Sequence, residues 1–366
     1  MTLILLLLTL AGPLTDGRKA PRKGGTERSV AAGLTWLAAH QGRDGAWDAD
    51  GFMKTARCKC DGKGGGWHGE PVACGFDKEV TALATLAFLG AGHTHRAGPY
   101  KDNVARALAW LQTARGRDTL FATAYATQAL AEALDMTGDE SLKPAVERGI
   151  DVMVGSRQPQ GGWRYWPGTR MASGVPTTTA VVVALRVCAR AGFDVDEAYK
   201  APVLKWLDKL VNRETGRVKY TLDAHKLGYT PTTTNAASAI LMRTWLGAPP
   251  GDLEIGAVMK RKPKWSIKFK RMKVKGRMRK VQIGYLQHYY WHHATEALAQ
   301  QGGAKWTSWN AALKKALIPK QRKDGHFAGS WDPAGTYGKV AGRVYSTALC
   351  TLMLEAPYRY PRARPR

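Results

Sequence analysis

The sequence predicts an all-α fold of the (α/α)6 toroid class, in which two concentric layers of helices close into a ring. Three observations predict it: six small, apolar helical segments rich in Ala and Thr, amphipathic helices that precede them, and a repeat of about fifty residues. The chain has 366 residues, 44% of them hydrophobic, with thirteen Trp, so it can bury a large core. An open superhelix is the alternative, but it needs polar end repeats, which the sequence lacks.

The apolar segments should form the inner layer, because they are apolar on nearly every face. They lie at 81–92, 123–134, 178–192, 234–247, 292–303 and 345–356. The helices before them carry charges on one side and should form the outer layer. These end near Trp36, Trp110, Met153, Trp206 and Leu313. A sixth outer helix is expected at about 253–260, which completes six pairs in one domain over residues 26–360.

A short motif recurs after outer helices and combines Gln, a Gly-containing turn and an aromatic residue. It reads "QGRDGAW" at 41–47, "QPQGGW" at 158–163 and "QRKDGHF" at 321–327. Gly permits a tight reversal, the aromatic should fill the space between repeats, and Gln should satisfy amides at helix ends. The motif is therefore predicted to hold the repeats together rather than to catalyse a reaction.

These segments resemble the QW repeats of squalene-hopene cyclases and of the related protein prenyltransferase β-subunits, over nearly the whole chain after Arg28. The resemblance implies a toroid but not the family's chemistry. The nearest match to the cyclase Asp-x-Asp-Asp is "DVDE" at 194–197, which lacks the final Asp and is expected to be a capping box with Asp194 as N-cap and Glu197 three residues later. No two Asp are adjacent to clamp Mg²⁺. No Asp-x-Cys with a distant matching His carries over the prenyltransferase zinc site.

The N-terminus is typical of a secretory signal. Residues 1–25 hold an apolar run of about ten residues, too short to span a bilayer, followed by a basic, polar segment. Export to the periplasm, cell envelope or extracellular space is therefore expected. A cytoplasmic protein is the alternative, because no Lys or Arg precedes the run. An exported chain would not meet the genome, so nucleic acid is expected as a partner only if this segment is not a signal. No other stretch is long and apolar enough for a transmembrane helix.

One segment is rich in metal-ligating side chains: Cys58, Cys60, His68 and Cys74. A Cys₃His zinc site is one interpretation. A disulfide from Cys74 to Cys58 or Cys60 is favoured, because Cys-x-Cys spacing is unusual for structural zinc and exported proteins form disulfides. Free thiols are the third interpretation, and no other cofactor is expected. Cys188 and Cys350 lie on apolar helices and should be core residues.

The starts of the inner helices should face a central cavity, where a ring would normally place its function. The polar and aromatic residues there are Asp77, Tyr125, Thr178, Asn235, His292, His293 and Tyr345. His292 and His293 are the strongest candidates, because His can act as an acid, a base or a ligand. The alternative for each residue is that it caps a helix or bonds to a nearby turn. As a group they predict a polar, aromatic cavity.

A basic insertion interrupts the repeat at about 260–285. Residues 260–280 hold twelve Lys or Arg and no acid, in a chain with 55 Lys+Arg against 29 Asp+Glu and a net charge of +26. Alternating apolar residues on both sides of Gly276 predict a β-hairpin. Its candidate polyanion-binding residues are Lys260, Arg261, Lys262, Lys268, Lys270, Arg271, Lys273 and Lys275. Like charges repel without a partner, so docking to an anionic surface or polyanion is favoured over a merely solvated feature. Residues 361–366 add a basic tail.

The sequence therefore predicts an exported binding or scaffold protein of the cell envelope, whose central cavity holds an apolar or isoprenoid-like ligand. One alternative is a lyase or transferase that acts on an isoprenoid at a non-standard site. A second is polyanion or nucleic-acid binding through the hairpin. The polarity of the cavity distinguishes the first two, because an enzyme needs titratable groups that converge there.

Overall fold

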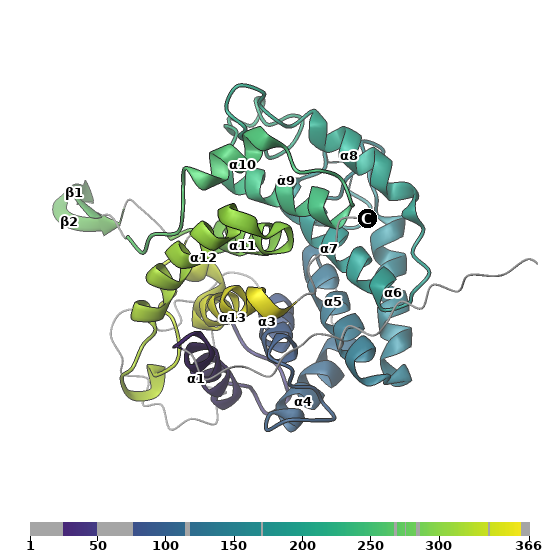
Figure 1. The fold of residues 1–366 in the computed structure, drawn as a ribbon, viewed down its shortest axis with the longest axis vertical. Helices are drawn as coiled ribbons and strands as arrows, with labels where there is room; N and C mark the ends of the chain where they lie inside the picture. Colours follow the sequence, from purple (N-terminus) through teal and green to yellow (C-terminus); the bar gives the residue numbers. More distant parts are fainter. Residues whose placement is uncertain are drawn as a thin grey trace, which may run out of the picture.

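The computed structural model describes residues 25–49, 76–113, 118–169, 171–266, 269–274, 276–282, 286–335 and 337–359. Twelve α-helices among these residues form two concentric layers (Figure 1), which confirms the predicted toroid. Three sequence predictions lie outside the described residues: the signal segment, the C-terminal tail and the cluster of Cys58, Cys60, His68 and Cys74.

The inner layer consists of the helices that are apolar on nearly every face. They are α3 (Asp77–Gly90), α5 (Leu120–Thr137), α7 (Val175–Arg190), α9 (Thr233–Trp245), α11 (His288–Gln301) and α13 (Gly338–Arg359). Each packs against the next, and α13 packs against α3, so the ring is closed. In α3 every residue from Glu79 to Gly90 is buried, as expected for a helix enclosed on all sides. Helix α13 is interrupted at Gly342, whose φ of 74° is left-handed.

The outer layer consists of the amphipathic helices. They are α1 (Gly25–Ala39), α4 (Lys101–Gln112), α6 (Lys143–Gly155), α8 (Lys200–Asp208), α10 (Asp252–Met259) and α12 (Gly303–Leu317). In α4, Val104, Ala107, Leu108 and Leu111 are buried at three- and four-residue spacing, which leaves the charged face to solvent. Helix α10 is the sixth outer helix that the sequence predicted. Short 3₁₀ turns flank α6, α8 and α12: η1 (Glu140–Leu142), η2 (Glu197–Tyr199), η3 (Ile318–Lys320) and η4 (Gly325–Phe327).

The repeated motif forms a corner between an outer helix and the next inner helix. The Trp163 indole donates to the Met153 carbonyl at 2.6 Å, and its backbone N–H donates to the Thr178 hydroxyl at 3.0 Å. The same two bonds recur at Trp47 with Leu37 and Thr81, and at Trp331 with Leu317 and Thr347. The third aromatic is therefore Trp331 and not Phe327, because four additional residues lengthen that turn.

Glycine is required two residues before each corner Trp. Gly45, Gly161 and Gly329 have φ of 98°, 114° and 95°. A Cβ at Gly161 would overlap the carbonyl of Pro202 in the next outer helix, and the other two meet the carbonyls of Arg106 and Ala32 in the same way. These glycines let consecutive repeats approach backbone to backbone, and Gly329 does so between the last repeat and the first.

The corner glutamines donate to carbonyls, whereas the sequence predicted that they would satisfy helix-end amides. Gln41 Nε2 donates to Gly45 O and Asn103 O, both at 2.8 Å. Gln321 Nε2 donates to Gly329 O and Ser29 O, also at 2.8 Å. Gln41 and Gln321 therefore each join their own turn to the next outer helix of the ring, whereas Gln158 donates to Thr169 O in its own loop at 2.8 Å.

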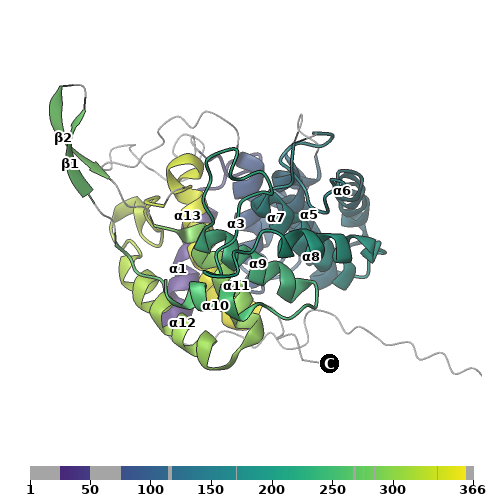
Figure 2. The ribbon, with the colours of Figure 1, turned by 90° about the horizontal axis from the view of Figure 1, so that it is seen from above.

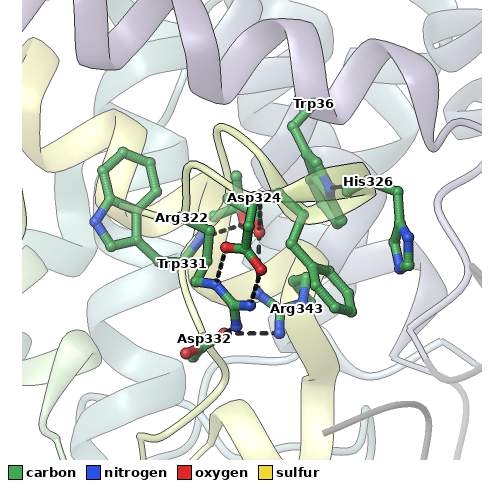
Figure 3. A network of polar contacts seen from close by, with 10 residues as sticks. Trp36, Arg322, Asp324, His326, Trp331, Asp332 and Arg343 are labelled. Atoms are coloured by element: carbon green, nitrogen blue, oxygen red, sulfur yellow. Dashed lines mark hydrogen bonds and ion pairs between the residues drawn. The ribbon is translucent and has the colours of Figure 1, made fainter. Parts of the chain in front are cut away.

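The ring is closed by a buried polar network between α1, α13 and the third corner (Figure 3). Arg343 is 1% exposed; it pairs with Asp332 at 2.7 Å, donates to Ser330 Oγ at 2.9 Å and lies over the Phe327 ring. The Trp36 indole of α1 donates to the His326 carbonyl at 2.8 Å. These contacts join the first and last repeats.

The basic insertion contains the predicted hairpin. Strands β1 (Phe269–Val274) and β2 (Arg277–Gln282) are antiparallel, with Lys273 opposite Met278. The hairpin projects away from the helical ring (Figures 1 and 2), on the side where loops lead into the inner helices.

Two smaller predictions have different outcomes. The cap near 194–197 is Asp196, whose side chain accepts from Ala198 N at 2.9 Å, and not Asp194. Glu197 pairs with Arg186 and Lys200 at the surface. The segment therefore caps a helix, as predicted, but through a different residue. Cys188 and Cys350 are buried free thiols, as predicted. No helix in the described part of the chain is both long and apolar enough to cross a membrane.

Candidate functional site

All six inner helices begin at one face of the ring, which we call the mouth, and the described loops that enter α7 and α9 cover part of it. The carbonyl of Tyr165 accepts from Leu120 N at 2.7 Å at the start of α5. The carbonyl of Tyr220 accepts from Val175 N at 3.0 Å at the start of α7. Each of these loops therefore lies over the start of the preceding inner helix, which brings its aromatic residues to the mouth.

Side chains fill the axis of the ring. The central cavity among the described residues has a volume of about 20 Å³, which is room for about one water molecule. Tyr125, His292 and His293 line it, as predicted. The prediction of an axial cavity for an isoprenoid-sized ligand is not supported, because a ligand of that size does not fit.

The floor of the axis, opposite the mouth, is a paired charge cluster of Gln128, Glu132, Glu355 and Arg359. The Arg359 guanidinium donates to both carboxylate oxygens of Glu132 at 2.9 Å and lies 3.8 Å from Glu355. Gln128 donates to Glu132 at 3.1 Å. Glu132 and Glu355 are fully buried, and the nearby Arg359 guanidinium compensates charge that would be costly to bury alone.

The two candidate histidines lie midway along the axis. His293 Nδ1 and Ser238 Oγ are 2.8 Å apart, and His292 Nε2 lies 3.7 Å from Glu296. Burial lowers the pKa of His292 to about 3 and that of His293 well below its usual value. Burial raises the pKa of Glu296 to about 7. At neutral pH both imidazoles are therefore uncharged, each with one donor and one acceptor nitrogen.

Glu79 is a buried carboxyl near the mouth that the sequence analysis did not single out. It accepts from Thr119 Oγ1 at 3.2 Å, and burial raises its pKa to about 7. Tyr125 lies near both Glu79 and Glu296, which add to the effect of burial in raising its pKa. The sequence signal was a carboxylate four residues before Leu83, on the axial face of an otherwise apolar helix.

Tyrosines from several repeats gather at the mouth. This tyrosine cluster consists of Tyr125, Tyr165, Tyr220, Tyr289, Tyr337 and Tyr345. Tyr289 is its centre: burial raises its pKa well above the usual value, and four of the other tyrosines add to that effect. The Tyr289 and Tyr337 rings meet edge to face at 5.6 Å. The guanidinium of Arg164 lies over the rings of Tyr165 and Tyr220.

A closed crevice, with a free volume of about 0 Å³ in this structure, lies beside Tyr289, between the starts of α11 and α13 and against Gly335 and Tyr337. Three polar side chains that line it are buried and have no hydrogen-bond partner: both ring nitrogens of His288 and the hydroxyls of Tyr289 and Tyr345. Burial lowers the pKa of His288 to about 4, so it is neutral at pH 7. Buried polar groups are nearly always bonded, so three unbonded side chains around one crevice are unusual, although the buried hydroxyls of Thr177 and Ser346 also lack a hydrogen bond.

Exposed aromatic side chains surround the crevice and the tyrosine cluster on the loops that cover the mouth. Trp166, Tyr229 and Tyr337 are 46%, 54% and 48% exposed. Trp166 borders a surface hollow of about 410 Å³. The Tyr229 ring packs on Tyr220 at 5.5 Å. These rings offer flat apolar faces to solvent beside buried polar groups.

The remaining candidates bind loops. Asp77 accepts from Ala49 N at 2.9 Å, and Thr178 supports the second corner. Asn235 donates to Val218 O at 3.3 Å. Among the described residues no group of three or more His, Cys, Asp or Glu is arranged to hold a metal ion.

The chain matches no protein-family model and no curated protein. It is similar to several solved structures. An α-1,6-mannanase of glycoside hydrolase family 76 from a Salegentibacter species has a TM-score of 0.61 and 12% identity, over 91% of this chain and 99% of that one. A cellobiose 2-epimerase from Bacillus thermoamylovorans has a TM-score of 0.59 and 12% identity, over 90% and 98%.

A type II terpene cyclase from Scytonema has a TM-score of 0.55 and 11% identity, over 91% of this chain and 98% of that one. All three share the double ring of helices, so the chain is an (α/α)6 toroid, the fold class that includes the terpene cyclases. At this level of identity the likeness concerns the fold alone.

Proposed function

We propose that this protein binds a saccharide at the crevice. The observation that carries the proposal is the set of three buried polar side chains, His288, Tyr289 and Tyr345, that share the crevice without a protein partner. An unsatisfied buried polar group costs about 1 to 3 kcal/mol. A ligand that bonds to all three recovers much of that free energy when it binds.

The three side chains fit hydroxyl groups. A tyrosine hydroxyl donates and accepts, and a neutral imidazole offers one donor and one acceptor nitrogen. A sugar hydroxyl also donates and accepts, so it can pair with either kind of group. The described residues that line the crevice include no Lys or Arg, whereas a phosphate or carboxylate would favour a cation there.

The aromatic surroundings fit the apolar face of a sugar ring. Tyr337 forms the outer wall of the crevice against Tyr289, and its side chain is half-exposed. Rotation of that side chain opens the crevice to solvent, and its ring then packs against the ligand. Trp166 and Tyr229 extend the platform for further sugar units.

The similar structures support a saccharide rather than an isoprenoid. One is described as a mannanase variant in complex with α-1,6-mannotriose, and another as a cellobiose epimerase. The terpene cyclase shares the fold, but the axis of this chain is filled. The predicted binding role is therefore kept, with a saccharide in place of the isoprenoid.

Titration calorimetry with α-1,6-mannotriose and with cellobiose tests the proposal. We expect wild type to bind at least one of them, and Tyr289→Phe and Tyr345→Phe each to weaken that binding by about 3- to 10-fold, the worth of one hydrogen bond. Tyr290→Phe is the matched control, because the Tyr290 hydroxyl bonds to Val258 O and Arg261 O away from the crevice. Binding that both crevice variants leave unchanged would refute the proposal, as would no binding of either saccharide.

Glycoside cleavage is the second candidate, and the state of Glu79 favours it. A carboxyl with a pKa of about 7 can donate a proton to a leaving oxygen near neutral pH. The mannanase variant with two consecutive aspartates replaced is described as inactive. This chain has no consecutive aspartates, so its chemistry would need Glu79 together with Glu296. Release of reducing ends from α-1,6-mannan by wild type, and its loss in Glu79→Gln, is the expected result; no release by wild type rejects this candidate.

A further inference from the structure

We propose that the saccharide belongs to an acidic polysaccharide, with its charged stretch along the basic hairpin and one sugar unit in the crevice. This inference rests on the proposed function of the crevice. It names the substrate class from the charges that surround the site.

The hairpin carries exposed cations with no acidic partner. Lys270, Arg271, Lys273 and Arg277 are exposed, and no carboxylate in the described part of the chain pairs with them. Neighbouring cations in this set lie within about one Debye length, about 8 Å at physiological salt, so each repels its neighbours. An anionic partner removes that repulsion.

The same charge continues from the hairpin back to the ring. Lys260, Arg261 and Lys262 follow α10 and are exposed, and Lys262 donates to Ser308 Oγ at 2.7 Å. The predicted candidates Lys268 and Lys275 lie outside the described residues. The cations therefore form a row along the segment that leaves the ring, rather than a patch on its outer wall.

The row of cations and the crevice belong to one surface. The hairpin projects on the mouth side of the ring (Figure 2), and Leu286, four residues after β2 ends, already lines the crevice. Trp265, before β1, packs on His288 with ring centroids 5.5 Å apart. A single chain can therefore lie on the hairpin and place its end beside His288.

An acidic polysaccharide is the partner that accounts for both features, because it carries hydroxyls and repeated negative charge on one chain. An anionic bilayer would explain the hairpin, where Met272 and Met278 are 44% and 61% exposed, but it would leave the crevice unused. Duplex nucleic acid would also engage the cations without supplying a sugar unit to a closed, neutral crevice.

Polygalacturonate and its methyl ester are a suitable pair of probes, because they share the same sugar chain and esterification replaces each carboxylate charge with a small neutral group. We expect the full-length wild-type protein to bind polygalacturonate at least about tenfold more tightly than the ester at 50 mM salt, and the difference to shrink as salt rises. The hairpin variant, with Lys270, Arg271, Lys273 and Arg277 all changed to Gln, should lose most of this preference, because Lys260, Arg261 and Lys262 remain. Tyr289→Phe should weaken the binding of both.

The control for charge changes four exposed outer-layer lysines to Gln: Lys205, Lys209, Lys315 and Lys320. It removes the same charge and should keep the preference. Equal binding of both polymers by wild type would overturn the acidic inference while the proposed function stands, and binding of neither polymer or oligosaccharide would overturn both. If Tyr289→Phe leaves polygalacturonate binding unchanged, and duplex DNA binds equally well, charge alone would explain the binding and the inference would be overturned. Tighter, hairpin-dependent binding to phosphatidylglycerol vesicles would assign the hairpin to a membrane instead.

Discussion

The floor of the ring and the crevice at its mouth both contain buried polar side chains, but they differ in hydrogen bonding. The floor side chains Gln128, Glu132 and Arg359 are bonded to one another, whereas the crevice side chains are not bonded. At the floor, Arg359 holds both oxygens of Glu132 and approaches Glu355. At the crevice, the ring nitrogens of His288 and the hydroxyls of Tyr289 and Tyr345 have no hydrogen-bond partner in the part of the chain that the structure describes. Helix α13 contributes to both regions, with Tyr345 at the crevice and Glu355 and Arg359 at the floor.

The difference separates paired polar groups from unpaired ones, which under the proposed function bond to a ligand. A paired buried cluster is costly to break, because loss of one partner leaves the other uncompensated. An unpaired buried hydroxyl is already costly, so its removal should cost stability little or nothing. Substitutions at the floor should therefore lower stability. Substitutions at the crevice should weaken binding and leave stability nearly unchanged.

The largest effect is expected at the floor. Arg359→Leu leaves Glu132 and Glu355 buried without a cation and should lower the free energy of unfolding by about 3 to 5 kcal/mol. Urea denaturation measures this. The control is Arg96→Leu, which removes a half-exposed pair with Asp139 and should change stability by less than about 1 kcal/mol. A loss at Arg359 no larger than the control's would show that the floor is not structural.

The next effect concerns Glu79, a buried carboxyl that accepts a hydrogen bond from Thr119 and has, among the described residues, no close cation paired with it in the way that Arg359 pairs with Glu132. Because burial raises its pKa from 4.5 to about 7, its contribution to stability is fully present below pH 4.5 and is lost as pH rises to about 7. The difference in unfolding free energy between wild type and Glu79→Gln should therefore shift against wild type by about 3 kcal/mol from pH 4 to pH 8. A difference that is constant with pH would contradict the raised pKa.

The corners should behave like the floor, since their polar groups are paired and their packing is tight. Gly161→Ala should destabilise the protein by about 2 kcal/mol more than Gly168→Ala, because only at Gly161 would the new methyl group meet the Pro202 backbone. Both glycines have left-handed φ, so backbone strain is common to the pair. Thermal unfolding of the two variants side by side provides the measurement; equal losses would mean that the close approach is not essential.

The smallest expected effect is a difference in stability between two variants at adjacent tyrosines. Tyr290→Phe removes a hydroxyl bonded to Val258 O and Arg261 O and should cost about 1 kcal/mol. Tyr289→Phe removes an unpartnered hydroxyl and should leave stability unchanged or slightly raised. Urea denaturation of both variants without saccharide tests this. If Tyr289→Phe is the more destabilising of the two, its hydroxyl has a structural partner and the crevice loses its main support.

Much of the fold was predictable because it depends on local pattern. Inner helices apolar on all faces and outer helices apolar on one face indicated two layers, and the row of cations around Gly276 indicated the hairpin. The details that failed depend on loop length or on a single bond. Four extra residues in the third corner place Trp331 outside the spacing of the other two motifs, so the sequence pattern pointed to Phe327. Asp194 and Asp196 can both cap a helix, so the sequence could not distinguish them.

The candidate site was only partly predictable. Tyr125, His292, His293 and Tyr345 were candidates, because a polar or aromatic residue near the start of an apolar helix is conspicuous; the structure places the first three along the axis and Tyr345 at the crevice. His288 was not, because nothing in its own neighbourhood distinguishes a bonded imidazole from an unbonded one. Whether its ring nitrogens find hydrogen-bond partners depends on what surrounds them, and Gly335 and Tyr345, which line the same crevice, lie about fifty residues further along the chain.

The sequence by itself determined the class of fold, the ring of six helix pairs and the basic hairpin, because periodicity, burial pattern and charge are carried by neighbouring residues. Only the tertiary structure decided that the axis is filled, that Arg359 neutralises the floor and that the crevice holds three unsatisfied groups. Hydrogen-bond satisfaction and desolvation depend on which distant residues meet, and that meeting occurs only when the ring closes.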